Sequence, residues 1–412
     1  MKKLSVVFLA LVLILPLVFI SCSKEEKSVA QTVSAPVVEQ VSYVLPESFA
    51  DGIYFAMADS FDSGGWKSTV TVVVEGGKIV DVDWNGVTEN ATLDKKAYDR
   101  AGKYNMVKFG NAIADWHVQA ERVEDYIVAT QDLTGVSFDA DGYTDAISGV
   151  TISVDEAFKL AIKALATPAV GKGPYTDGSY FAIEEQYPDS GWKEYINLTV
   201  INGNIVAARW NAFDKSGNDK VAYDKAGNYN MVKFGGAQAE WYVQAQRVEA
   251  QLIKDQDPNK VDTVSGVSVG TEEPMSLAKI ALANGPVTSG PYTDGLYFAS
   301  QANFPDSGWK SNATLLIKNG NIVDVYISGV NKDGDDKKDF DKAGKYNMVK
   351  FGGAQAEWYE QAERVENFIL ETQDIKAVTY NASGETDVVS GVSIAVDEYV
   401  KLLEAALAAG PR

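Results

Sequence analysis

Hydrophobic residues occur with two spacings along the chain: at every second position, and then at every third or fourth position. This succession occurs three times. In three places apolar and polar residues alternate on both sides of a tight turn, as in Ile79-Val80-Asp81-Val82. Alternation of this kind predicts β-strands with one buried face, and a central Gly-Gly or Asn-Gly pair favours a hairpin. The predicted turns are Gly76-Gly77, Asn202-Gly203 and Asn319-Gly320. We therefore expect three β-hairpins.

After each hairpin, apolar residues recur at every third or fourth position. This period predicts an amphipathic helix with a buried stripe, and we favour core packing over a ligand-binding row of side chains. The stripe residues are Trp116, Ala120, Val123 and Ile127, then Trp241, Ala245, Val248 and Leu252, then Trp358, Ala362, Val365 and Ile369. A further helix closes each copy, for example around Phe158–Ile162. Strand and helix periods in succession indicate an α+β fold.

The same motifs occur three times in the same order. Asp-Gly-x-Tyr-Phe-Ala begins at Asp51, Asp177 and Asp294, Tyr-Asn-Met-Val-Lys-Phe-Gly begins at Tyr104, Tyr229 and Tyr346, and Ser-Gly-Val begins at Ser148, Ser265 and Ser390. A chain of 412 residues has room for two or three domains of ~150 residues, and the motifs make it three. We predict tandem repeats over 48–168, 172–286 and 289–412, each an antiparallel sheet with a hairpin packed against helices.

The amino terminus has the pattern of a bacterial export signal. Lys2 and Lys3 precede an apolar run, and small Ser21 precedes Cys22, the only cysteine of the chain. The run is short for a spanning helix, although an uncleaved signal anchor is the alternative. We predict a lipoprotein signal peptide over 1–21, acylation of Cys22 with lipid such as palmitate, and a lipidated flexible tether over 22–47. The protein would then lie at the cell envelope, on the outer membrane or the periplasmic face of the inner membrane of a two-membrane cell, or exposed at its surface.

Composition excludes several classes of function. Asp and Glu total 57 against 37 Lys and Arg, a formal charge of −20, and such a surface repels nucleic acids. His117 is the single histidine, so the chain lacks the residues for a haem motif, a Cys/His zinc site or a Ser-His-Asp triad. We expect His117 to be hydrogen-bonded or at the solvent edge, and we predict no metal site. Redox chemistry would need an organic cofactor.

The turn before the last helix of each copy is the most informative junction. In copy one, Ser148-Gly149-Val150-Thr151 leads to Ser153, which has capping-box spacing to Glu156. Free backbone N–H groups at a helix start favour an anion, and small residues let a phosphate approach. An ordinary cap without a ligand is the alternative, because Ser and Thr cap helices routinely. The local residues leave both interpretations open.

Each copy resembles the FMN-binding domain of the flavoprotein subunits of sodium-pumping and Rnf-type redox complexes, and in style the flavinylated lipoproteins of extracellular electron transfer. That family carries the motif Asp-x-x-Ser/Thr-Gly-Ala-Thr, where a flavin transferase joins the FMN phosphate to the Thr hydroxyl. Copy one matches it at Asp145, Ser148, Gly149 and Thr151, with Val150 in place of Ala. The resemblance covers nearly all of residues 48–411. It implies FMN as the cofactor and Thr151 as the attachment site, and Ser153 is a further cofactor-binding candidate.

Copies two and three depart further from the family motif. Ser268 and Ser393 replace the Thr, and a serine hydroxyl can form the same phosphoester. The candidates in these copies are Ser265, Gly266 and Ser268, and Ser390, Gly391 and Ser393. In copy one, the candidates to flank the isoalloxazine ring are Trp66, Tyr104, Asn105 and Met106, with core packing as the alternative.

The resemblance implies a membrane-anchored flavoprotein that carries electrons and has no substrate of its own. Its expected partners are the membrane through Cys22, a flavin transferase, and an electron-donating membrane complex or another redox protein. The rival hypothesis is a surface lipoprotein whose degenerate domains bind no cofactor and serve as a binding or adhesive module. Val in the motif and Ser at two of the three acceptor positions motivate it.

Overall fold

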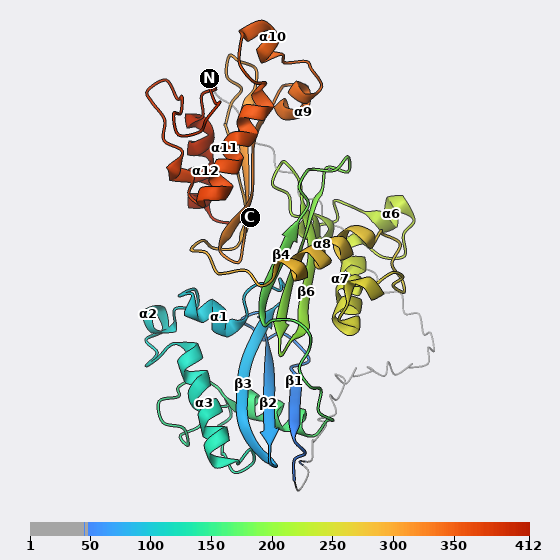
Figure 1. Cartoon of the computed structure of the whole chain (residues 1–412), viewed down its shortest axis with the longest axis vertical. Coiled ribbons are helices and arrows are strands. Elements are labelled where there is room, and N and C mark those ends of the chain that lie inside the picture. The colour runs from blue at the N-terminus through green and yellow to red at the C-terminus, as the bar shows by residue number, and fades with distance from the viewer. Residues whose placement is uncertain (1–44, 46–47) are drawn as a thin grey trace, which may run out of the picture. The chain divides into compact units, whose positions relative to one another are not determined.

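The computed structural model describes Leu45 and residues 48–412 (Figure 1). The predicted signal peptide, Cys22 and the tether except Leu45 lie outside the described residues, so acylation stays a prediction. Among the described residues, no helix is long and apolar enough to cross a membrane.

The first repeat is a three-stranded sheet followed by helices. Its elements are β1 (Gly52–Met57), β2 (Trp66–Glu75), β3 (Lys78–Thr88), α1 (Lys95–Arg100), α2 (Met106–Gly110), α3 (Trp116–Thr130) and α4 (Asp155–Leu165). The strands pair antiparallel in the order β1-β2-β3. Helix α3 packs on β3, and α4 packs on β1 and β2 (Figure 1).

The other two repeats have the same order of strands and α-helices, with a 3-10 turn added before the last helix. The second consists of β4 (Gly178–Ile183), β5 (Lys193–Ile201), β6 (Asn204–Phe213), α5 (Lys220–Lys225), α6 (Met231–Gly235), α7 (Trp241–Asp255), the 3-10 turn η1 (Pro258–Lys260) and α8 (Glu272–Asn284). The third consists of β7 (Gly295–Ser300), β8 (Lys310–Lys318), β9 (Asn321–Val330), α9 (Lys337–Lys342), α10 (Met348–Gly352), α11 (Trp358–Thr372), η2 (Ile375–Ala377) and α12 (Asp397–Ala409). Three separate antiparallel sheets packed with helices confirm the predicted α+β repeats.

The predicted hairpin turns are confirmed, and their backbone explains the residues found there. Asn202 and Gly203 have φ of 52° and 70°, and Gly76 and Gly77 have 59° and 72°. Two successive positive φ angles match the right-handed twist of the strands, and Gly and Asn tolerate them best. The Asp of the first motif supports the turn, since Asp51 accepts a hydrogen bond of 2.8 Å from the Gly77 N–H.

Two polar side chains tie α3 to the sheet, the buried Glu124 and the exposed Gln131 at the C-cap. Glu124 accepts a hydrogen bond of 2.6 Å from the Trp84 N–H, and the Gln131 side chain bonds both the N–H and the carbonyl of Ile79. These bonds satisfy strand groups that have no partner strand on that side. The predicted apolar stripe is confirmed as core, because Trp116, Ala120, Val123 and Ile127 are all at most 3% exposed.

Candidate functional site

A buried glutamine holds the candidate acceptor hydroxyl of the first repeat. Gln119 lies on α3 and is fully buried. Its side-chain oxygen accepts hydrogen bonds from the Thr151 N–H at 2.7 Å and from Thr151 Oγ1 at 3.2 Å, and its Nε2 donates to the Ala114 carbonyl at 2.8 Å. Thr151 itself is exposed. The hydroxyl is therefore fixed in place while remaining open to solvent.

The second and third repeats present their serines in the same way. Gln244 accepts hydrogen bonds from the N–H and Oγ of Ser268 at 2.6 and 3.2 Å. Gln361 does the same for Ser393, at 2.7 and 3.2 Å. Both serines are exposed. The exchange of Thr for Ser thus leaves the position of the hydroxyl unchanged.

An arginine from the same helix contacts the backbone of each turn. Arg122 donates to the Gly149 carbonyl, Arg247 to Gly266 and Arg364 to Gly391. Gly149 has φ of +79°, and a Cβ atom there would lie 2.6 Å from Arg122 Nη1. Both the backbone angle and the contact with arginine require glycine at this position. The guanidinium thus binds the backbone two residues before the acceptor Thr151.

The expected capping box at the start of α4 is wrong. The N-cap position is Val154, with no side-chain cap, and the Ser153 hydroxyl donates to Asp155 Oδ1 at 3.2 Å. The N–H groups of Val154 and Asp155 both donate to the Gly142 carbonyl, at 2.9 and 3.3 Å. A loop that returns to the helix start therefore takes the place of the cap, and these groups are not free for an anion.

The other motif residues of the first repeat differ in exposure. Asp145 and Ser148 are exposed. Val150 is partly buried and packs against the core, as do Val267 and Val392 in the other repeats. The larger valine is thus accommodated by core packing below the turn.

Of the four candidates to flank a flavin ring, Trp66 is mostly enclosed. It is 6% exposed, and its ring meets those of Tyr98 and Tyr104 edge-on, with centroids 5.5 and 6.2 Å away. Tyr104 and Met106 are partly buried against the core. Asn105 adopts a left-handed conformation with φ of 54° and donates its amide to the Gly102 carbonyl. Trp66, Tyr98 and Tyr104 thus form an aromatic cluster, and of the four candidates Tyr104 and Met106 are packed against the core but only partly buried.

The invariant Met-Val-Lys-Phe-Gly run forms a short helix with no buried residue, α2, α6 or α10. Its phenylalanine is about three-quarters exposed in every repeat: Phe109 75%, Phe234 75% and Phe351 76%. An apolar ring in water contributes nothing to the core, so its recurrence needs another explanation. The helix is linked to the acceptor turn, because Gln119 joins Thr151 to Ala114, just beyond α2.

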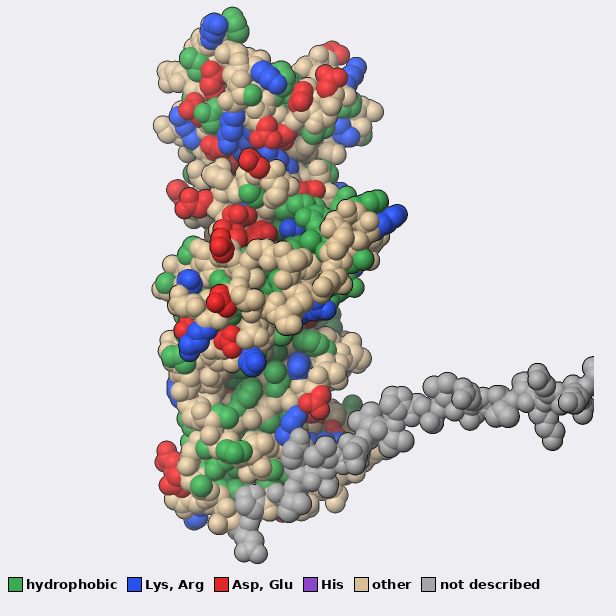
Figure 2. All heavy atoms as spheres, turned by 90° about the vertical axis from the view of Figure 1, so that its right-hand side faces the viewer, with side chains coloured by type: hydrophobic (Ala, Val, Ile, Leu, Met, Phe, Trp, Pro, Cys, Tyr) green, Lys and Arg blue, Asp and Glu red, His purple; other side chains and the backbone are tan. Residues whose placement is uncertain are grey.

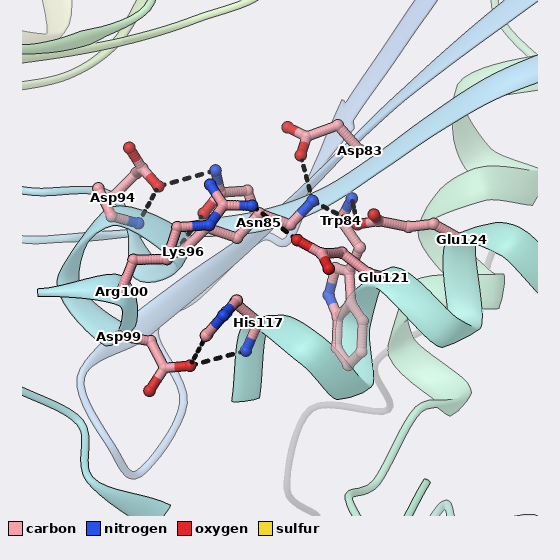
Figure 3. A network of polar contacts seen from close by, with 11 residues as sticks. Asp83, Trp84, Asn85, Asp94, Lys96, Asp99, Arg100, His117, Glu121 and Glu124 are labelled. Atoms are coloured by element: carbon pink, nitrogen blue, oxygen red, sulfur yellow. Dashed lines mark hydrogen bonds and ion pairs between the residues drawn. The ribbon is translucent and has the colours of Figure 1, made fainter. Parts of the chain in front are cut away.

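A polar network joins α1, α3 and β3. Figure 3 shows the Lys96 ammonium between Asp83 and Glu124, and each carboxylate is 2.6 Å from it. Asp99 Oδ2 accepts hydrogen bonds from the N–H and Nδ1 of His117, at 2.7 and 2.6 Å. His117 is therefore hydrogen-bonded and partly buried. In the part of the chain that the structure describes, no group of three or more His, Cys, Asp or Glu could hold a metal ion.

Each repeat also contains a buried carboxylate oxygen without a hydrogen-bond partner. These atoms are the Oδ1 of Asp99, Asp224 and Asp341. Burial raises the pKa of Asp224 and of Asp341. An unpaired buried oxygen is costly to the fold, and this cost occurs at the same position in all three repeats.

Acidic and basic side chains are interspersed on the face shown in Figure 2. This distribution provides no continuous basic surface there for a polyanion. The acidic run from Asn331 to Asp339 forms a turn and a helix start, with Asn331 Oδ1 accepting from two backbone N–H groups and Asp336 capping α9.

Two sets of residues at the site are not evident from the sequence patterns. One is Gln119, Gln244 and Gln361, which occur three residues after the first Trp of each long helix. The other is Lys95, Lys220 and Lys337, the first residues of α1, α5 and α9. These residues recur at fixed positions in the three repeats, and that recurrence could have identified them. Their roles could not be predicted, because their contacts join residues far apart in the chain.

The sequence matches no protein-family model and no curated protein. A protein of Clostridium thermocellum with a solution NMR structure is 54% identical over 28% of this chain and 88% of that one, with a TM-score of 0.24. A crystal structure of a Clostridium perfringens protein is 25% identical over 27% of this chain and 89% of that one, with a TM-score of 0.25. Neither description names an activity or a ligand.

Proposed function

We propose that the protein is an electron carrier of the cell envelope, anchored through Cys22, in which FMN is esterified at Thr151 and, by the same geometry, at Ser268 and Ser393. The observation that carries this proposal is the acceptor hydroxyl, exposed and held by a buried glutamine in all three repeats.

The residues present fit a phosphate-linked flavin. The turn offers an exposed hydroxyl for the ester, and Arg122 beside it compensates part of the phosphate charge. The partly buried Tyr104 and Met106 supply aromatic and sulfur surface for the ring. Since the helix N–H groups are already bonded, the phosphate would depend on arginine rather than on the helix dipole.

The attachment is a group transfer that needs an activated flavin. The Thr151 oxygen would form the new O–P bond and lose its proton, while the anhydride P–O bond of a flavin dinucleotide breaks and releases a nucleoside monophosphate. A flavin transferase would catalyse this step. Once bound, FMN accepts and releases one or two electrons, and the protein orients it and tunes its potential.

Intact mass and visible absorbance of the full chain coexpressed with a flavin transferase test the proposal. One to three FMN-sized additions, mapped to Thr151, Ser268 or Ser393, are expected. Thr151→Ala should remove the addition on the first repeat. A colourless, unmodified protein that also fails to bind added FMN would overturn the proposal.

One observation favours the rival function, a cofactor-free binding module. Phe109, Phe234 and Phe351 present an apolar ring to solvent in each repeat. Exposed aromatic side chains at regular intervals are suited to binding a partner surface. A protein that binds cells or matrix through these rings, without flavin absorbance, would establish this function instead.

A further inference from the structure

Each repeat encloses one lysine among aromatic rings, and we call Lys95, Lys220 and Lys337 the caged lysines. Lys95 Nζ lies 4.5 Å from the ring centroid of Trp116, 5.3 Å from Tyr104 and 5.6 Å from Trp66. Lys220 lies 4.3 Å from Trp241, and Lys337 lies 4.2 Å from Trp358. All three lysines are at most 8% exposed. Ring faces attract the ammonium group and offset part of the cost of its burial.

The cage is built on the elements that carry the acceptor turn. Trp116 begins α3, and Gln119, which holds Thr151, lies one helical turn further on. On the opposite side, Glu156 of α4 accepts a hydrogen bond of 2.8 Å from Ser68, two residues after Trp66 on β2. The caged lysine and the acceptor hydroxyl are therefore both tied to α3, through Trp116 and Gln119.

The second repeat differs from the others at one position beside this lysine. Ser68 and Ser311 follow their Trp-Lys pairs, whereas Glu194 follows Trp192-Lys193. Glu194 Oε1 lies 3.6 Å from Lys220 Nζ, and Oε2 accepts a hydrogen bond of 2.9 Å from Trp210 Nε1. Within the described residues, Lys95 and Lys337 have no carboxylate oxygen within 4.0 Å.

We infer that Glu194 gives the flavin of the second repeat a lower reduction potential than the flavins of the first and third repeats. The inference rests on the proposed FMN function. FMN that takes up two electrons and one proton carries one more negative charge than oxidised FMN. A caged lysine with no carboxylate at ion-pair distance stabilises that added charge, and Glu194 cancels much of this effect because it lies 3.6 Å from Lys220.

The test substitutes the residue that follows the Trp-Lys pair, Ser68, Glu194 or Ser311, in the full chain. Each flavin is isolated by changing the other two acceptor hydroxyls to Ala, and its midpoint potential is titrated against indicator dyes with a chemical reductant. Glu194→Gln keeps the size of the side chain and should raise the potential of the second repeat. Ser68→Glu and Ser311→Glu should lower those of the first and third. Glu185→Gln, an exposed carboxylate of the second repeat, is the matched control and should leave the potential unchanged.

The outcomes separate this inference from the proposed function. A loaded repeat whose potential does not move, or moves in the opposite direction, overturns the inference and leaves the flavin assignment intact. Absence of flavin in every repeat overturns both. Circular dichroism and melting temperature show whether each variant is folded. A readout without flavin is the Lys220 ammonium pKa by NMR, which should fall in Glu194→Gln because its counterion is lost.

Discussion

Glu366 and Lys338 form an ion pair of 2.5 Å inside the third repeat, where the second repeat has Glu249 and Val221 at the corresponding positions. The first repeat has the pair as Glu124 and Lys96. Glu249 still accepts the backbone hydrogen bond from Trp210, at 2.8 Å, but the positive charge that acts on it most is Arg209 on the strand. One buried glutamate therefore has two different electrostatic environments within a single chain.

This difference predicts opposite effects of the same substitution. Burial raises the pKa of both Glu249 and Glu366 to about 7 from an ordinary value of 4.5, so the two repeats differ in the partner that a substitution leaves behind. The folded state then binds the proton more tightly than the unfolded state, so stability falls as pH rises from about 4.5 to about 7, by about 3 kcal/mol in total. Glu249→Gln should remove this loss and stabilise the second repeat at pH 8.

The matched change Glu366→Gln leaves Lys338, 3% exposed, without its partner and should destabilise the third repeat by about 3–5 kcal/mol at pH 8. Hydrogen exchange of β6 and β9 peptides at pH 5 and pH 8 reports the stability of the second and third repeats separately. Equal effects of both substitutions would contradict the interpretation.

Gln119→Leu should prevent flavin attachment at Thr151 although the acceptor itself is present. The change removes both hydrogen bonds that fix Thr151 and leaves the Ala114 carbonyl unpaired, at a cost of about 1–3 kcal/mol. Gln131→Leu is the control, since it breaks comparable bonds to Ile79 at the other end of α3. Peptide mass mapping should find flavin on Thr151 in Gln131→Leu but not in Gln119→Leu. Flavin on Thr151 in both variants would show that Gln119 does not position the hydroxyl.

Two glycines with the same backbone angle provide a test of the turn. Gly149 and Gly65 both have φ of +79°, but a Cβ atom meets Arg122 only at Gly149, and nothing lies within 4 Å at Gly65. Gly65→Ala should cost about 1 kcal/mol for the backbone angle alone. Gly149→Ala should cost more and displace Arg122, which lowers flavin loading as well. The melting temperatures and the flavin content of the two variants are compared, and equal losses would mean that the contact with Arg122 has no effect.

Replacing Phe109, Phe234 and Phe351 together with Ser should leave stability within about 0.5 kcal/mol, because these side chains make no core contact. Retention on a hydrophobic column should decrease. If the rings bind a partner, cell or matrix binding is lost in this variant while its melting temperature is unchanged. A marked drop in melting temperature would show that the rings support the fold.

Short-range patterns were sufficient to predict the hairpins and the long helices. The Asn202-Gly203 turn and the stripe from Trp116 to Ile127 are encoded by neighbouring residues, and both are confirmed. The site depends on contacts across the chain, such as the bond between Gln119 and Thr151, 32 residues apart. The Ser153 cap was wrong for the same reason, because the Gly142 carbonyl that replaces it comes from a preceding loop.

The cation next to the buried glutamate comes from a helix in the first repeat, Lys96, and from the sheet in the second, Arg209. This difference limits how the repeats can exchange segments by recombination. A hybrid of the first sheet with the second set of helices would place Asp83 near Glu249 without Lys96, leaving two acidic groups and no base. The reciprocal hybrid would bring Arg209 and Lys96 together against one glutamate. Crossovers of the second repeat with either of the others are therefore expected to preserve folding only in the segments between repeats, so the sheet and helices of the second repeat must be inherited together.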